Sequence, residues 1–166
     1  MERWQELDAA APADARATLS ACCGSSRWVE RMLARRPYGG RDALLKAARD
    51  EWFALPPDDW REAFSYHPKI GDRASLAVRF PASHRLSTRE QSGVDAASDE
   101  VLTALAEAND AYADRFGFTF IVCATGKTAD EMLHLLRARL PNDRDTELRV
   151  AAEEQTKITE LRLDAP

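Results

Sequence analysis

His67 and Pro68 carry the clearest indication of acid–base chemistry in this sequence. An apolar helical pattern at spacing i, i+3 and i+4 leads to them through Trp60, Ala63 and Phe64. His67 occupies position i+7, and because a residue before proline is pushed out of the helical region, its ring should lie at the helix exit along the buried face. An imidazole held there suits a positioned acid or base, although a core histidine bonded to a backbone carbonyl fits the same pattern.

Ser87, Glu90 and Gln91 form a second place where side chains could do chemistry. Ser-x-x-Glu is a capping box, in which the serine oxygen accepts from one helix amide and the glutamate returns to the serine amide. The residues that follow, from Ser92 to Asp95, offer little apolar stripe for a helix to bury. We therefore keep a second interpretation, in which Glu90 and Gln91 point into a site and the helix start supplies amides for an anionic group.

Arg162 is the third candidate. At about 100° per residue, five positions of the last predicted helix fall within about 40° of one direction. They are Leu148, Ala151, Gln155, Ile158 and Arg162. A guanidinium on that inward face requires a carboxylate, a carbonyl or a bound anion, so the choice lies between an internal salt bridge and a ligand contact.

The run from Phe118 to Ala124 is the strongest β-prone segment, and it has no evident strand partner. It follows a long helix predicted from Ser98 to Phe116, which Gly117 should end. Asn109 lies on the inward stripe of that helix and is expected to brace a loop. An irregular apolar segment would line a cavity with its own backbone groups, or serve only as core.

The rest of the chain reads as helix, so we predict an all-α single domain over residues 1–166, with about eight to nine helices and the irregular segment lining the site. The further expected helices are 13–23, one beginning at 25 or 26, 42–53, one beginning at 58 or 59, 73–80, 128–140 and 145–163, with a loop over 81–86.

Composition restricts the possible partners. The 23 basic and 28 acidic residues are interspersed and give a net charge of −5, so no basic tract is available to follow nucleic acid. No apolar run approaches the length of a membrane span, and the first residues lack a signal-peptide core, which leads us to expect the cytoplasm. Neither the 3 cysteines nor the 3 histidines have the spacing of a metal site, and Cys22 and Cys23 fit small hydrophobic packing positions.

Taken together, a set of short motifs across the chain resembles the OHCU decarboxylases, which act on 2-oxo-4-hydroxy-4-carboxy-5-ureidoimidazoline in urate breakdown. The motifs are Cys22-Cys23-Gly24-Ser25-Ser26-Arg27-Trp28, Arg36-Pro37, Asp59-Trp60, His67-Pro68-Lys69-Ile70-Gly71-Asp72, Ser87-x-x-Glu90-Gln91, Asn109-x-x-Tyr112, Phe116-Gly117-Phe118-x-Phe120-Ile121, Lys157-Ile158 and Leu161-Arg162-Leu163. They occur in order over essentially the whole chain.

The resemblance implies an all-α carboxy-lyase, usually a homodimer, that converts this substrate to (S)-allantoin and CO2 without a cofactor or metal. The site residues that it implies are His67, Pro68, Ser87, Glu90, Gln91, Phe118, Phe120, Ile121 and Arg162.

The chemistry of the substrate fits these residue types. The carbon that loses CO2 bears a hydroxyl and adjoins a C=N carbon, so the released electrons have an internal sink and no cofactor is required. We assign proton transfer to His67, with Glu90 orienting it or the substrate hydroxyl, and leave open which of the two delivers the final proton. Arg162 would hold an anionic or carbonyl oxygen. The remaining candidates would bind the ureido and ring amides or exclude water.

Two other classes of function remain. A ring-opening amidohydrolase acting on a ureide would normally show a metal cluster or an activated nucleophile, and the sequence shows neither pattern. A helical binding module without catalysis would have no reason to bring His67, Glu90 and Arg162 together.

Overall fold

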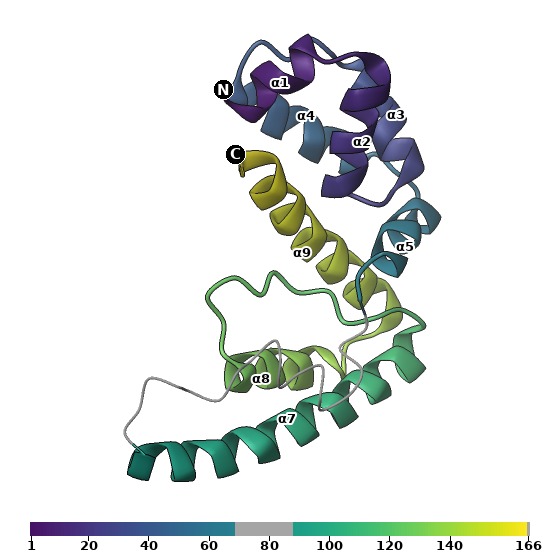
Figure 1. The fold of residues 1–166 in the computed structure, drawn as a ribbon. Coiled ribbons are helices and arrows are strands. Elements are labelled where there is room, and N and C mark those ends of the chain that lie inside the picture. The colour runs from purple at the N-terminus through teal and green to yellow at the C-terminus, as the bar shows by residue number, and fades with distance from the viewer. Residues whose placement is uncertain (69–87, 166) are drawn as a thin grey trace. The chain divides into compact units, whose positions relative to one another are not determined.

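The computed structural model describes residues 1–68 and 88–165, with the backbone alone for residues 88–98. The described residues form helices and no strand, which confirms the all-α class (Figure 1). The helices are α1 (Arg3–Ala9), α2 (Pro12–Cys22), α3 (Ser26–Ala34), α4 (Arg41–Phe53), α5 (Pro57–Ser65), α7 (Thr88–Phe116), α8 (Ala129–Arg139) and α9 (Arg144–Asp164). The predicted helix over 73–80 and loop over 81–86 lie outside the described residues.

The chain divides into two compact units. The first comprises Met1–His67, Ile121–Cys123 and Leu148–Pro166, and the second comprises Pro68–Phe120 and Ala124–Glu147. The expectation of one domain over residues 1–166 stays a prediction.

Buried tryptophans hold the helices of the first unit together. The indole N–H of Trp28 donates to the carbonyl of Ala48 at 3.0 Å, and that of Trp52 donates to Ala152 at 2.9 Å. Trp60 donates to the carbonyl of Trp52 at 2.9 Å. Because a buried indole needs an acceptor for its N–H, these bonds fix α3, α4, α5 and α9 in register with one another.

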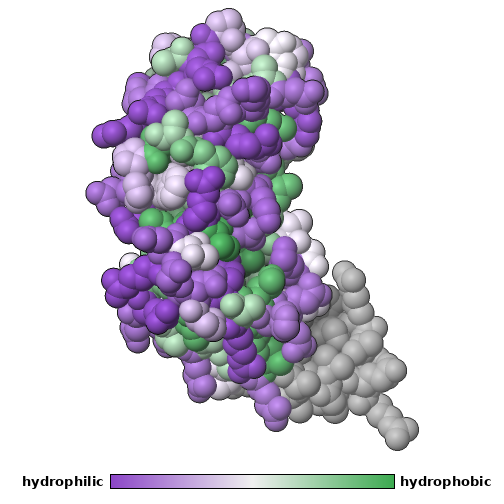
Figure 2. All heavy atoms as spheres, turned by 180° about the vertical axis from the view of Figure 1, so that it is seen from behind, coloured by the Kyte–Doolittle hydropathy of each residue, from purple (hydrophilic) through white to green (hydrophobic). Residues whose placement is uncertain are grey.

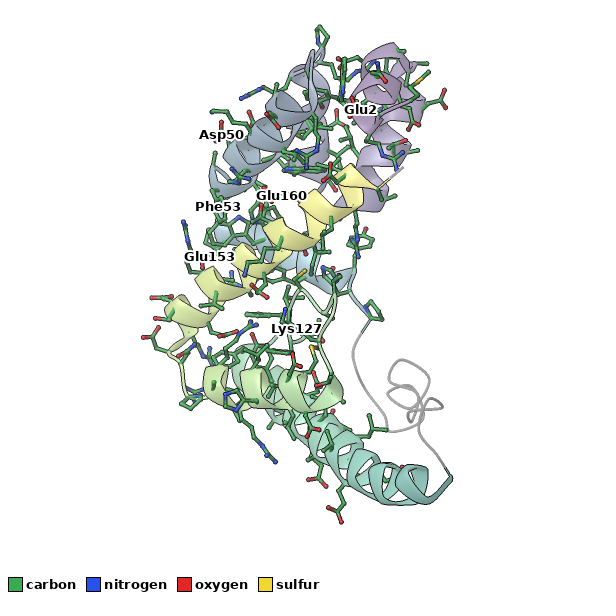
Figure 3. The ribbon with its side chains drawn as sticks, turned by 90° about the vertical axis from the view of Figure 1, so that its left-hand side faces the viewer. Glu2, Asp50, Phe53, Lys127, Glu153 and Glu160 are labelled. Atoms are coloured by element: carbon green, nitrogen blue, oxygen red, sulfur yellow. The ribbon has the colours of Figure 1, made fainter. Side chains whose placement is uncertain are left out.

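Ion pairs and a ring contact connect α9 to α4 on the surface of the first unit. Glu160, labelled in Figure 3, projects from α9 and pairs with Arg49 of α4. The Arg149 guanidinium lies 4.7 Å from the ring centroid of Phe53. An exposed pair contributes little to stability, so the position of α9 against α4 depends mainly on the buried contacts beneath.

The local signals around α3 and α5 act as predicted. Ser25 caps α3 by accepting from the Trp28 amide at 3.3 Å. On α5 the predicted stripe of Trp60, Ala63 and Phe64 is buried. The helix ends at Ser65, and the His67 amide donates to the carbonyl of Phe64 at 3.2 Å. His67 therefore lies at the helix exit, as Pro68 requires.

In the second unit α7 begins earlier than predicted. The helix runs without a break from Thr88 to Phe116, so the expected start at Ser98 is wrong. The weak apolar pattern around Gly93 does not stop it, because a mid-helix glycine costs only about 1 kcal/mol while the helical hydrogen bonds on both sides continue. Gly117 ends α7 with a φ of 79°, as predicted, and its amide donates to Ala113 at 2.8 Å.

α8 lies beside α7 in this unit (Figure 1). Asn109 of α7 is buried, and the Nδ2 atom of its side-chain amide donates to the Leu105 carbonyl of its own helix at 3.0 Å. The expectation that it braces a loop is therefore wrong, because the nearest carbonyl for a buried amide in mid-helix is the one a turn earlier. The segment from Phe118 to Ala124 is neither helix nor strand, as predicted.

The surface shown in Figure 2 is mostly hydrophilic, as 31% charged residues would give. Among the described helices, none combines the length and apolar character that crossing a bilayer requires.

Candidate active site

A pocket of about 370 Å³ lies within the first unit, where the end of α2, the exit of α5 and the last turns of α9 meet. Its lining residues are Ser20, Ala21, Gly24, Ala63, Tyr66, His67 and Arg162. Two of the three side chains predicted to do chemistry, His67 and Arg162, thus share one pocket although they are far apart in sequence.

His67 is half-buried at the edge of this pocket. Its Nε2 atom lies 2.5 Å from Oε1 of Gln155 on α9. Because an amide oxygen accepts but cannot donate, Nε2 carries the hydrogen in this contact. The lone pair of the neutral ring is then on Nδ1, and that nitrogen can accept a proton in an acid–base step.

The exposure of Arg162 differs from the prediction made from the sequence. It was predicted to continue the buried face of α9, whereas the residue is exposed. It lies near the end of the helix, where a long side chain reaches past the core to the pocket rim. Its Nη1 donates to the Cys22 carbonyl at 3.2 Å, so its partner is a carbonyl rather than the carboxylate of an internal salt bridge. This bond holds the cation at the pocket.

Gly24 and Tyr66 were not among the predicted site residues. A Cβ atom built on Gly24 would lie 2.5 Å from Cδ2 and 2.8 Å from Cγ of Tyr66. The turn after α2 and the exit of α5 therefore touch closely enough to require glycine. Tyr66 itself is 73% exposed beside the pocket. A glycine within a motif is a weak signal, and only the packing shows what it contacts.

Gln155 is a further functional candidate that sequence reasoning placed on the buried stripe without a role. It is 1% exposed, and its Nε2 donates to Oγ1 of Thr159 at 3.0 Å. A polar residue in the middle of an apolar stripe is the signal that points to it, because a buried amide needs partners.

Cys22 and Cys23 are both buried, which confirms that they pack as small hydrophobic groups. Burial raises the pKa of Cys22 above its usual value and raises that of Cys23 to about 12. Since the thiolate is the reactive form of cysteine, burial disfavours nucleophilic chemistry at both thiols.

The aromatic candidates Phe118 and Phe120 lie in the second unit and pack on Tyr112, with ring centroids 5.8 Å and 5.3 Å away. The guanidinium of Arg139 stands 4.5 Å from the ring of Phe120 and pairs with the fully buried Glu147. Phe120 is thus fixed by a buried cluster within its unit.

Tyr112 completes that cluster, since its hydroxyl donates to Glu147. Burial, and then this bond, raises its pKa well above the usual range. Ile121 belongs to the first unit and is 1% exposed.

The remaining candidates are not tested by the side-chain geometry. Ser87 lies outside the described residues. Glu90 and Gln91 lie in the first turn of α7, where the backbone alone is described. Pro68 is exposed and directly follows His67. Within the part of the chain that the structure describes, no group of three or more metal-ligating side chains gathers.

Comparison with known proteins identifies the family to which the chain belongs. The family model described as OHCU decarboxylase matches residues 8–164. The chain therefore belongs to the OHCU decarboxylase family.

Individual relatives agree with this assignment. The chain is 42% identical over 143 residues to the uric acid degradation bifunctional protein TTL of Arabidopsis thaliana, covering 86% of this chain but only 44% of that protein. It is 32% identical to the 2-oxo-4-hydroxy-4-carboxy-5-ureidoimidazoline decarboxylase of Amia calva, over 77% of this chain and 73% of the relative. A crystal structure of OHCU decarboxylase in the presence of (S)-allantoin superposes with a TM-score of 0.68 at 40% identity, covering 87% of this chain and 92% of the other.

Proposed function

We propose that this chain decarboxylates 2-oxo-4-hydroxy-4-carboxy-5-ureidoimidazoline to (S)-allantoin and CO2, the carboxy-lyase step of urate breakdown. Family membership supports the proposal, and so does one observation of the structure. His67 and Arg162, selected from the sequence as an acid–base group and an anion-binding group, line the same pocket.

The reaction asks for positioning and proton transfer. As the bond to the carboxylate breaks, its electrons form a double bond to the adjoining carbon, and the C=N electrons move onto nitrogen. CO2 departs and leaves an enol that carries a negative charge on that nitrogen. The nitrogen takes up a proton, the hydroxyl gives up its proton as it becomes a carbonyl, and a proton is added to the ureido-bearing carbon. The protein must deliver the proton on carbon to one face of a planar intermediate, because the product is a single enantiomer.

His67 is the proton-transfer group in this proposal. Its Nδ1 is the basic nitrogen of the neutral ring, because Nε2 donates to Gln155. Arg162 binds an anionic or carbonyl oxygen of the substrate. Its planar fork carries five N–H donors, and the contact with Cys22 involves one nitrogen, Nη1.

The other assignments rest on the resemblance to the family. Glu90 would orient His67 or the substrate hydroxyl, while Ser87, Gln91 and the backbone near Phe120 and Ile121 would bind the ureido and ring amides. Phe118 and Ile121 would exclude water, and Pro68 would fix the direction of the imidazole. Replacing Glu90 by Gln keeps the side-chain volume and removes the charge, so a folded Glu90→Gln protein with wild-type turnover would remove it from the catalytic group.

A coupled assay tests the function. The substrate is generated from urate with upstream enzymes, and circular dichroism follows the allantoin that forms. We expect (S)-allantoin to accumulate faster than the uncatalysed decay gives it. Racemic product at the uncatalysed rate would refute the proposal. Release of a ring-opened ureide without CO2 would instead indicate an amidohydrolase, and binding without turnover would indicate a binding module.

We also propose a homodimer that works in the cytoplasm, as the resemblance and the sequence composition predict. Sedimentation equilibrium gives the oligomeric state directly, and a mass of one chain at micromolar concentration would contradict the dimer. Fractionation of expressing cells tests the location.

A further inference from the structure

Three side chains of α9 lie on one stripe at spacing i, i+4 and i+7, and the last of them, Arg162, lines the pocket. Gln155 bonds to His67, and Arg162 bonds to the carbonyl of Cys22. Between them Thr159 accepts from the Gln155 amide at 3.0 Å. Hydrogen bonds thus connect Thr159, Gln155 and the imidazole of His67.

The orientation of the Gln155 amide follows from its two partners. Gln155 is 1% exposed and Thr159 is 5% exposed, so water does not compete for the bond between them. The Thr159 oxygen accepts from the NH2 group of Gln155, which leaves the amide oxygen to face His67.

We propose that Gln155, oriented by Thr159, is a positioning residue that keeps the proton of His67 on Nε2 and the basic lone pair on Nδ1. The inference rests on the proposed function for its catalytic meaning, but the tautomer itself is a property of the free protein. If the amide turned over, its NH2 would face Nε2, and the ring would have to accept there and carry its proton on Nδ1. The basic nitrogen would then be the wrong one for the reaction.

Nitrogen-15 NMR of histidine-labelled protein tests the tautomer, because the two ring nitrogens differ in chemical shift according to which one is protonated. The chain has 3 histidines, and the spectrum of His67→Gln identifies the signals of His67 by their absence. At a pH where the ring is neutral, the wild-type protein should show His67 protonated on Nε2.

Gln155→Met removes the acceptor at similar length, and Thr159→Val removes the hydroxyl at nearly constant volume. Both variants should shift the His67 signals toward the Nδ1–H form or toward a mixture. Both should lower kcat about threefold to tenfold with little change in KM, which corresponds to the loss of one neutral hydrogen bond. Thr159→Ser restores the hydroxyl and should recover both the signature and the rate relative to Thr159→Val.

The proposal is overturned if wild-type His67 carries its proton on Nδ1, or if its signature is the same in wild type, Gln155→Met and Thr159→Val. Thermal unfolding checks that each variant is folded, and the two substitutions on different residues protect against a failure of either one. If wild-type protein shows no decarboxylation, the function proposal fails while the NMR result still decides the tautomer.

Discussion

His67 and Arg162 come from different ends of the chain, yet each reaches the pocket for a local reason. Pro68 forces His67 out of the helix at the exit of α5. Arg162 lies near the end of α9, and its bond to the Cys22 carbonyl holds the guanidinium at the rim. We therefore make a separate prediction for each side chain, one for the chemical step and one for substrate binding.

Replacing His67 by Gln should abolish most decarboxylation without unfolding the protein. The variant keeps a polar side chain of similar length near Gln155 but cannot carry a proton between reacting atoms, so kcat should fall by about 100-fold or more. Initial rates and a thermal melt measure the two effects. A folded variant with near wild-type turnover would exclude His67 from proton transfer.

Replacing Arg162 by Lys should raise KM about tenfold, because the charge remains while the planar fork of donors is lost. Arg49→Lys is the matched control. Arg49 of α4 pairs with Glu160, which lies on α9 like Arg162, but Arg49 is not a lining residue of the pocket. The control should leave KM unchanged and alter stability by less than about 1 kcal/mol. Equal KM values for wild type and Arg162→Lys would argue against a substrate contact.

At the scale of elements, the pocket depends on how the turn after α2 meets the exit of α5. Gly24 allows the turn to pass directly under the ring of Tyr66. Ser25 then caps α3 and fixes where the next helix begins. These two helix ends therefore build part of the pocket wall, and Arg162 of α9 lines it as well.

Gly24→Ala should destabilise the protein by about 1–3 kcal/mol, because the new Cβ would overlap the base of the Tyr66 ring. Urea unfolding measures this loss. Tyr66→Ala in the Gly24→Ala background should recover most of it, since the overlapping atoms are gone. Additive losses in the double variant would show that the two residues do not meet.

For the whole molecule, the buried thiol and phenol groups predict how the free energy of unfolding depends on pH. Burial raises the pKa of Cys23 from 9.0 to about 12, and it also raises the pKa of Tyr38 and of Tyr112. In the unfolded chain these groups have their ordinary values, so the unfolded state loses protons first as the pH rises. Their contribution is complete below the unfolded pKa and is lost at higher pH.

The free energy of unfolding should therefore fall steadily between about pH 9 and pH 11. Urea unfolding at a series of pH values measures this dependence. Cys23→Ala should flatten the first part of the decline, because it removes a buried thiol and thiols have a lower ordinary pKa than phenols. A constant stability over this range would contradict the assignment of buried neutral groups.

The sequence by itself determined the features that depend on neighbouring residues. Pro68 ends α5 beside His67, Gly117 ends α7 with a positive φ, and Ser25 caps α3, each through bonds to residues within a turn or so. The all-α class and the irregular segment after Gly117 follow from the same short-range preferences and were predicted correctly.

Only the tertiary structure decided the features that depend on which distant atoms meet. Helical periodicity placed Arg162 inward and Gln155 on a stripe, but the exposure of the first and the bond from the second to His67 depend on where α9 passes α2 and α5. The approach of Gly24 to Tyr66 is equally invisible in sequence. The face of a helix on which a residue lies follows from its spacing in the sequence. The residues that it contacts follow from packing between helices, and contacts of this kind form the pocket.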